Sequence, residues 1–225
     1  AFLTGFALAI FYVTMGLPIA VYADRTNRRN VVALALGIWS LMTALCGAAQ
    51  GYWQLLFARI GVGFGEAGGT PPSHSIISDM FPWNQRAMAF TIFALGSSLG
   101  SMLGSASGYI SDAIGWRMVF FIFGVPGILV ALVVRFSLRE PQRGALDVRK
   151  TEGVPFKDTL RFMFKGDTQR HCLIGILLFA IWGYGLMWWS PTFLIRSFGL
   201  SVGEAGGTLL PIHGIGGTLS LVLTA

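Results

Sequence analysis

Two ionisable side chains, Arg59 and Glu66, stand in a stretch that is otherwise mostly apolar, Tyr52–Ser78. They are seven residues apart, close to two helical turns, so a helix places both on one face. Along the helix axis they are separated by roughly 10 Å, which is too far for a direct ion pair. A guanidinium suits phosphate or carboxylate groups, and a carboxyl in a dry site can bind and release a proton. We therefore predict that Glu66 responds to protons and that Arg59 binds an anionic group or balances Glu66.

Such a pair can also be structural, satisfied by neighbouring helices. Ionisable groups at membrane depth face a protein interior or an aqueous cavity, which favours the functional interpretation. The neighbouring glycines are expected to leave room around the two charges: Gly61, Gly63, Gly65, Gly68 and Gly69. Pro71 and Pro72 are expected to disturb the helix beyond them.

A second charged cluster, Tyr22–Asn30, connects two apolar runs and holds Asp24, Arg25, Arg28 and Arg29. The three arginines can be explained by the positive-inside rule of membrane topology, but that rule does not explain the presence of Asp24.

Three further side chains are candidates for the lining of a cavity. Trp182 and Tyr184 lie deep in the sixth apolar run, and His213 lies midway along the last one. Trp188 and Trp189, nearer the outer end, fit an aromatic belt at the membrane surface. A lone histidine is also compatible with hydrogen-bonded packing.

The sequence contains none of the patterns of a soluble-type enzyme. It has no phosphate-binding loop, no Cys/His metal spacing and no Ser/His/Asp set at one membrane depth. A retinal protein is excluded because all three lysines lie in one polar segment. We therefore expect no enzymatic activity, no cofactor and no metal.

The elements that position these residues are predicted to be membrane-spanning helices. Of the 225 residues, 54% are hydrophobic and 12% are charged. A span needs roughly 20 apolar residues. Seven runs qualify: 1–23, 31–50, 52–78, 88–110, 118–134, 172–194 and 202–225. The fold is therefore predicted to be all-α and polytopic, and both ends of the chain are expected to lie within membrane segments.

The charge distribution gives the orientation. Thirteen of the sixteen Lys and Arg residues fall in the connections 23–30, 79–87 and 135–171. By the positive-inside rule these connections are cytoplasmic, in an inner or plasma membrane. The net charge of +6 then needs no nucleic-acid partner.

The long connection 135–171 divides five spans from two. Within it, Phe156–Lys165 has apolar residues at helical spacing with basic residues between them, which predicts an amphipathic helix on the inner membrane surface. In the fourth span, Gly96, Gly100, Gly104 and Gly108 form a strip on which another helix can pack closely.

The stretch Ala20–Arg29 resembles the signature loop between helices two and three of the major facilitator superfamily. It matches at Asp24, Arg25 and Arg29, and it departs at Ala20 and Asn27, where glycine is usual. Further similarities are Arg59 with its glycine-rich continuation, Asp79–Arg86, Gly115–Arg117 and the long central connection. Within the superfamily, Asn27, Glu66 and the sequence REPQRG at 139–144 look like the spinster family.

The resemblance implies twelve helices in two halves, of which the chain contains helices two to eight. Residues 1–134 would form the first half without its first helix, 135–171 the linker, and 172–225 the start of the second half. It also implies an inner gate, in which Asp24 caps the N-terminus of a helix in the other half. In that gate Arg25 belongs to the same motif, and Arg28 or Arg29 reaches Asp79.

The function implied is secondary transport by alternating access. The expected partners are protons, the lipid bilayer and an amphipathic anionic substrate of the lysolipid or sphingoid class, carried by a monomer. One alternative is an exporter of another small organic anion or drug. Others are an uncoupled lipid scramblase or channel-like path, and a receptor that binds without transport.

Overall fold

The computed structural model describes residues 7–144, 146 and 156–224, and within these ranges the regular structure is helical. The first half contains six helices, α1 Ala7–Arg25, α2 Arg28–Ala48, α3 Tyr52–Ala67, α4 Thr70–Met80, α5 Trp83–Ile114 and α6 Trp116–Ser137. The rest consists of α7 Phe156–Lys165, α8 Asp167–Phe198, α9 Val202–Pro211, the π-helix η2 Ile212–Gly216 and α10 Gly217–Thr224. The all-α fold predicted from the sequence is confirmed.

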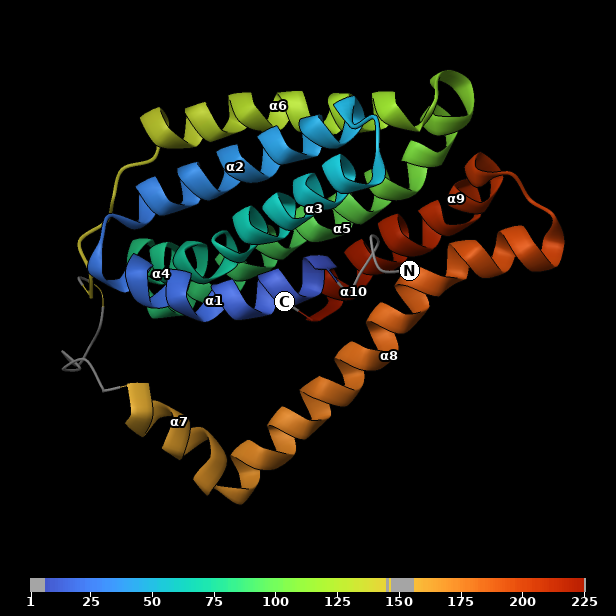
Figure 1. The fold of residues 1–225 in the computed structure, drawn as a ribbon. Helices are drawn as coiled ribbons and strands as arrows, with labels where there is room; N and C mark the ends of the chain where they lie inside the picture. Colours follow the sequence, from blue (N-terminus) through green and yellow to red (C-terminus); the bar gives the residue numbers. More distant parts are fainter. Residues whose placement is uncertain (1–6, 145, 147–155, 225) are drawn as a thin grey trace.

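In the described residues each of the seven predicted spans contains helix, and the predicted helix in the long connection is α7. Among these residues four helices are long and apolar enough to cross a membrane, namely α2, α5, α6 and α8. The connections 23–30 and 79–87 and the residues 138–144 after α6 lie at one end of the bundle, on the left in Figure 1. We call this end inner and the opposite end outer.

The third predicted span is interrupted, as Pro71 and Pro72 led us to expect. Helix α3 ends at Ala67, and α4 begins at Thr70 with a proline in its first turn. The last span is also broken, because Pro211 at the end of α9 cannot donate a backbone hydrogen bond, and a π-helical turn follows.

The turn between α1 and α2 explains a departure from the superfamily pattern. Asn27 occupies the place where glycine is usual, and it has an ordinary φ of −73°. Its side-chain oxygen accepts a hydrogen bond of 3.0 Å from the backbone N–H of Asn30. Asn27 is therefore the N-cap of α2, a role that asparagine fills well and that needs no positive φ.

The first half packs around α2, which contacts α3 on one side and α6 on the other. A Cβ atom on Gly65 would lie 2.6 Å from the backbone nitrogen of Trp39, and one on Gly61 would lie 2.5 Å from Cγ of Met42. The expectation that these two glycines leave room around the charges is therefore wrong. They let α3 approach α2 closely.

Gly124 makes the equivalent close approach between α6 and α2, because a Cβ atom there would lie 2.5 Å from the backbone nitrogen of Ala44. Gly124→Ala is expected to lower the free energy of unfolding by about 1–3 kcal/mol, because the helices must separate. Gly96→Ala is the matched control, since nothing lies within 4 Å of its Cβ position. Denaturant unfolding in detergent measures both, and equal stabilities would contradict the packing described.

Candidate functional site

A buried arginine organises the inner ends of the first-half helices. Arg28, the first residue of α2, is 1% exposed. Its guanidinium donates hydrogen bonds to Oδ2 of Asp79 at 2.5 Å and to Oγ of Ser75 at 2.7 Å, both on α4. It also donates to Oε1 of Glu140 at 2.8 Å and to the carbonyl of Pro141 at 3.1 Å. Arg28 thus joins α2, α4 and the segment after α6 through ion pairs with two carboxylates.

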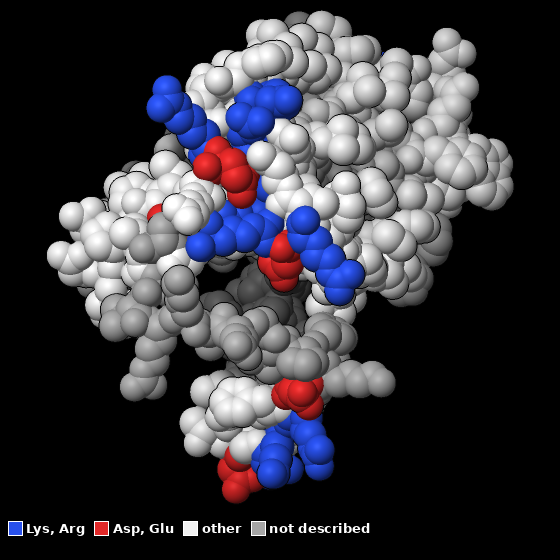
Figure 2. Space-filling model, turned by 90° about the vertical axis from the view of Figure 1, so that its left-hand side faces the viewer, with Lys and Arg blue, Asp and Glu red and all other residues white. Residues whose placement is uncertain are grey.

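The segment that follows α6 closes over this arginine. The backbone N–H of Arg29 donates to Oε2 of Glu140 at 2.8 Å, and that of Gly144 donates to Oδ1 of Asp79 at 3.0 Å. Arg143 donates to the carbonyls of Ala23, at 2.7 Å, and of Asp24, both in the last turn of α1. Figure 2 shows the inner end, where positive and negative side chains gather. We call Arg28, Asp79, Glu140 and Arg143 the inner charge cluster.

The predicted gate residues have different positions in this arrangement. Arg28 meets Asp79, one of the two contacts that the sequence suggested. The side chain of Arg29 instead reaches the carbonyl of Leu138 and its neighbour Asn30. Arg25 and Asp24 are exposed, and the described residues provide no partner for the Asp24 carboxylate, whose backbone carbonyl accepts from Arg143. Capping by Asp24 stays a prediction.

The ionisation of Glu140 follows from its contacts. Burial acts to raise the pKa of this carboxyl, but the hydrogen bonds from Arg29 and Arg28, together with the charge of Arg28, outweigh burial and lower the pKa. A depressed pKa in the folded state stabilises the protein above the ordinary carboxyl value of 4.5. That stabilisation is lost as the pH falls through the lowered value.

We accordingly expect Glu140→Gln to reduce the loss of stability between about pH 5 and about pH 2. Melting temperatures of the two proteins across this range test the expectation. Glu204→Gln, at an exposed carboxylate, is the control and should keep the wild-type slope. If Glu140→Gln kept it as well, the ion pair would contribute nothing in solution.

Glu66 is the penultimate residue of α3, directly before the break, and is half-buried. No ion pair to it occurs among the described residues. Its nearest polar surroundings include Tyr12 of α1, which interacts with Thr70 and lies within electrostatic range of both Glu66 and Tyr184 of α8. The Glu66 carboxyl is thus linked to Tyr12, and Tyr12 in turn to polar groups of α4 and α8.

Arg59 has a different environment. Its guanidinium lies over the ring of Phe120 on α6, 5.1 Å from the ring centroid, beside the buried core of Cys46, Ala58 and Val62. No hydrogen bond or ion pair joins it to Glu66 in the described part of the chain. The two charges share one helix, but each has its own surroundings, in line with their separation along the axis.

The three candidate lining residues also differ. Tyr184 and Trp182 are exposed by 65% and 62%, and of the two only Tyr184 enters the surroundings of Tyr12. His213 lies in the π-helix, where its Nδ1 is 2.8 Å from Oγ of Ser105 on α5. His213 is thus hydrogen-bonded between the two halves.

The sequence did not identify Tyr12 as a neighbour of Glu66, or Glu140 and Arg143 as members of the inner charge cluster. Glu140 and Arg143 belong to REPQRG, which supported the family resemblance, but nothing in it indicated contacts with the α1–α2 turn. Tyr12 is an aromatic residue in an apolar run, and its neighbours come from three other helices.

The family model of the Major Facilitator Superfamily matches residues 2–225. An MFS-type efflux pump of Mycolicibacterium smegmatis is 33% identical over 98% of this chain and 51% of its own length. Human protein spinster homolog 1 is 29% identical over 83% of this chain and 37% of its own. The chain thus spans about half the length, or less, of these curated relatives.

Among solved structures, a bacterial homolog of the human lysosomal transporter spinster, crystallised inward-facing and unoccupied, matches with a TM-score of 0.78 and 35% identity. The match covers 98% of this chain and 52% of that one. A bacterial spinster homolog in an inward-facing and occupied conformation matches with a TM-score of 0.69 and 38% identity, over 91% of this chain and 47% of that one. The chain therefore belongs to the major facilitator superfamily, within which it is similar to the spinster family.

Proposed function

We propose that this chain is part of a secondary active transporter that works by alternating access. The observation that carries the proposal is Glu66, a half-buried carboxyl within a broken helix, with no ion pair in the described chain and with Tyr12 of α1 as a polar neighbour. An ionisable group at such a depth costs several kcal/mol, so a functional role is the default explanation.

The arrangement of the halves supports the same proposal. Helix α8 contacts α9 near its outer end, and its inner end diverges from the first-half helices in Figure 1. The matched crystal structures of bacterial spinster homologs are inward-facing, and we infer the same conformation for this chain. In such a state a group near the break between α3 and α4 is accessible from the inner side, and rocking of the halves would expose it to the other.

Glu66 is proposed as the group that couples transport to protons. It binds a proton when it faces the more acidic side and releases it after the halves have rocked. Tyr12 and Thr70 are its proposed polar partners, and Tyr184 contributes from the second half.

The proposed substrate is an amphipathic anion of the lysolipid or sphingoid class. Arg59 offers the fixed positive charge, and the exposed aromatic and aliphatic residues of α8 offer apolar surface for a hydrocarbon chain. The similarity to an efflux pump favours a second candidate, a smaller organic anion or drug.

The inner charge cluster is proposed as the support of an inner gate. Arg28 holds the end of α4 against the α1–α2 turn, and this places Asp24 and Arg25 on the exposed inner surface. There Asp24 can meet a helix N-terminus of the other half when the inner side closes. No oligomeric contact is needed, so the transporter is proposed to act as a monomer.

A counterflow assay in proteoliposomes distinguishes the two substrate classes. The intact protein is loaded with one compound and exposed to labelled lysophospholipid, sphingoid base, organic anion or drug. Exchange of the lipids alone supports the proposal. Exchange of only the small anions or drugs favours the efflux alternative, and binding without exchange would contradict transport.

A further inference from the structure

The two halves meet most extensively where α5 of the first half packs against α9 of the second. The contact continues through η2 and α10 toward the membrane centre. Gly96 and Gly100, further along α5 toward the inner end, have nothing within 4 Å of their Cβ positions. The predicted glycine strip is therefore in close contact with another backbone only at its outer member, Gly108.

We call this contact between α5 and α9 the seam. At its outer end, a carboxylate of one half accepts a hydrogen bond from the backbone of the other half. Oδ2 of Asp112, near the end of α5, accepts from the N–H of Gly203 at 2.7 Å. Gly203 is the second residue of α9, so its N–H has no partner within the helix. The negative charge also lies at the positive end of the helix dipole.

The other side-chain acceptors at the N-terminus of α9 belong to its own capping box. Oγ of Ser201 accepts from the N–H of Glu204 at 3.2 Å, and Oε2 of Glu204 accepts from the N–H of Ser201 at 2.8 Å. This capping box satisfies two backbone donors locally. The N–H of Gly203 is not part of this box and turns to the opposite half, so Asp112 adds an acceptor across the interface.

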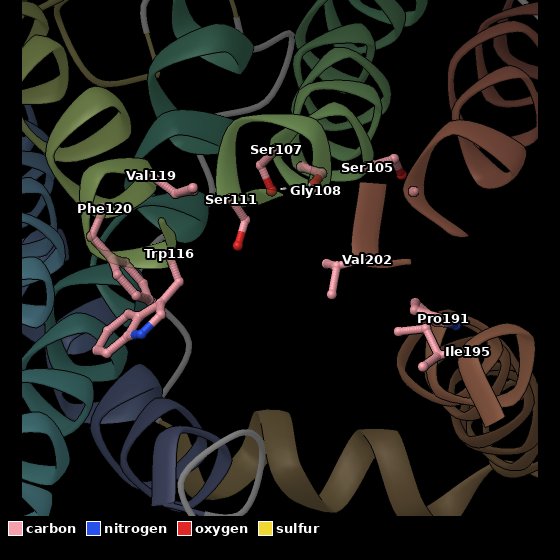
Figure 3. A pocket seen from close by; sticks show the side chains of 12 residues that line it. Ser105, Ser107, Gly108, Ser111, Trp116, Val119, Phe120, Pro191, Ile195 and Val202 are labelled. Carbon is pink, nitrogen blue, oxygen red and sulfur yellow. Dashed lines mark hydrogen bonds between the residues drawn. The ribbon is translucent and has the colours of Figure 1, made fainter. Parts of the chain in front are cut away.

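The seam depends on glycine at the points of closest approach. A Cβ atom on Gly108 would lie 2.6 Å from the carbonyl oxygen of Val202, and one on Gly203 would lie 2.6 Å from Oδ2 of Asp112. Figure 3 shows Gly108 and Val202 beside a hollow of about 250 Å³, whose far wall includes Ile195 of α8. The backbones of α5 and α9 thus meet directly at one side of this hollow.

We propose that Asp112 is the acceptor of an outer latch, whose hydrogen bond to the N-terminus of α9 holds the two halves together at their outer ends while the inner side is open. The inference rests on the alternating-access function proposed above. Opening the outer side separates α5 from α9, which breaks this bond and exposes the Gly203 donor. The inner charge cluster acts within one half, whereas the latch acts between the halves, so the two can be tested independently.

The latch is tested by spin-label distances in the intact transporter in proteoliposomes. One label pair, at Ile114 and Ser197, reports the outer ends of α5 and α8, and a second, at Met80 and Thr168, reports the inner ends of α4 and α8. All four positions are exposed. Cys172 is exposed and is first replaced by serine, whereas Cys46 is buried.

In Asp112→Ala the population with a long outer distance should rise about tenfold relative to wild type, and the inner distance should shorten in the same molecules. Asp112→Asn keeps an acceptor without the charge, so its shift should be smaller. Gly108→Ala should act in the same direction as Asp112→Ala because it displaces Val202. Gly104→Ala is the matched control, with nothing within 4 Å of its Cβ position, and should resemble wild type.

The possible outcomes distinguish a failure of the latch proposal from a failure of the proposed transport function. If the wild-type distances respond to substrate or to a pH gradient but Asp112→Ala and Gly108→Ala leave both distributions unchanged, the latch is overturned and alternating access stands. If the wild-type distances respond to neither, the proposed function fails and the latch fails with it.

Discussion

Glu66→Gln is expected to abolish the response of transport to a pH gradient while leaving exchange of substrate intact. Glutamine keeps the shape of the side chain and its capacity to interact with Tyr12, but it cannot carry a proton between the two sides. A gradient of one pH unit can drive up to about tenfold accumulation per coupled proton. The accumulation ratio of the variant should therefore fall to about one, as expected for facilitated diffusion.

Accumulation in proteoliposomes at several pH gradients, compared with counterflow at equal pH, measures this effect. Glu204→Gln applies the same chemical change to an exposed carboxylate of the α9 capping box and should keep the wild-type ratio. A Glu66→Gln protein that still accumulates substrate with the wild-type dependence on pH would remove Glu66 from the coupling step.

Arg28→Met is expected to cause the largest loss of stability among single changes in the inner charge cluster. Methionine fills much of the space but leaves Asp79, with a side chain 9% exposed, and Glu140, at 21%, without their cation. Loss of one partner from a buried ion pair costs about 3–5 kcal/mol, because the remaining charge is desolvated and uncompensated. Unfolding by denaturant in detergent should show a reduction of this size.

A matched variant and a double variant sharpen this test. Arg25→Met removes an exposed arginine from the same turn and should change the stability by less than about 0.5 kcal/mol. Adding Asp79→Asn to Arg28→Met should recover part of the loss, because a neutral amide does not need the missing charge. Equal stabilities for the Arg28 and Arg25 variants would show that the buried ion pairs are not stabilising.

The helices were predictable because the membrane requires long apolar segments, and the runs between the charged connections are long enough to be recognised individually. The points at which the helices are interrupted were harder to predict. The break at Gly68–Gly69 was indicated by two prolines. Pro211 likewise marks an irregular point in the last span, but a proline alone does not indicate that a π-helical turn will follow.

Residues of the candidate site could be predicted where a charged side chain stands in an apolar run, because such a charge is unusual. Arg59 and Glu66 stand out in an apolar run, and Arg28 with Asp79 could be paired once the family resemblance set the helix order. Glu140 and Arg143 could not be placed, because their contacts depend on the conformation of an irregular segment that folds back over the α1–α2 turn. The role of glycine in α3 was misjudged because spacing alone does not show which face meets α2.

The measurement that bears most directly on the proposed function is the uptake of a labelled lysophospholipid into proteoliposomes of the intact protein, with and without an imposed pH gradient. We predict that the lipid accumulates against its own gradient when the proton gradient is present, and only equilibrates when the proton gradient is collapsed. Equilibration at the same rate and to the same level under both conditions would contradict proton-coupled alternating access and would favour an uncoupled path.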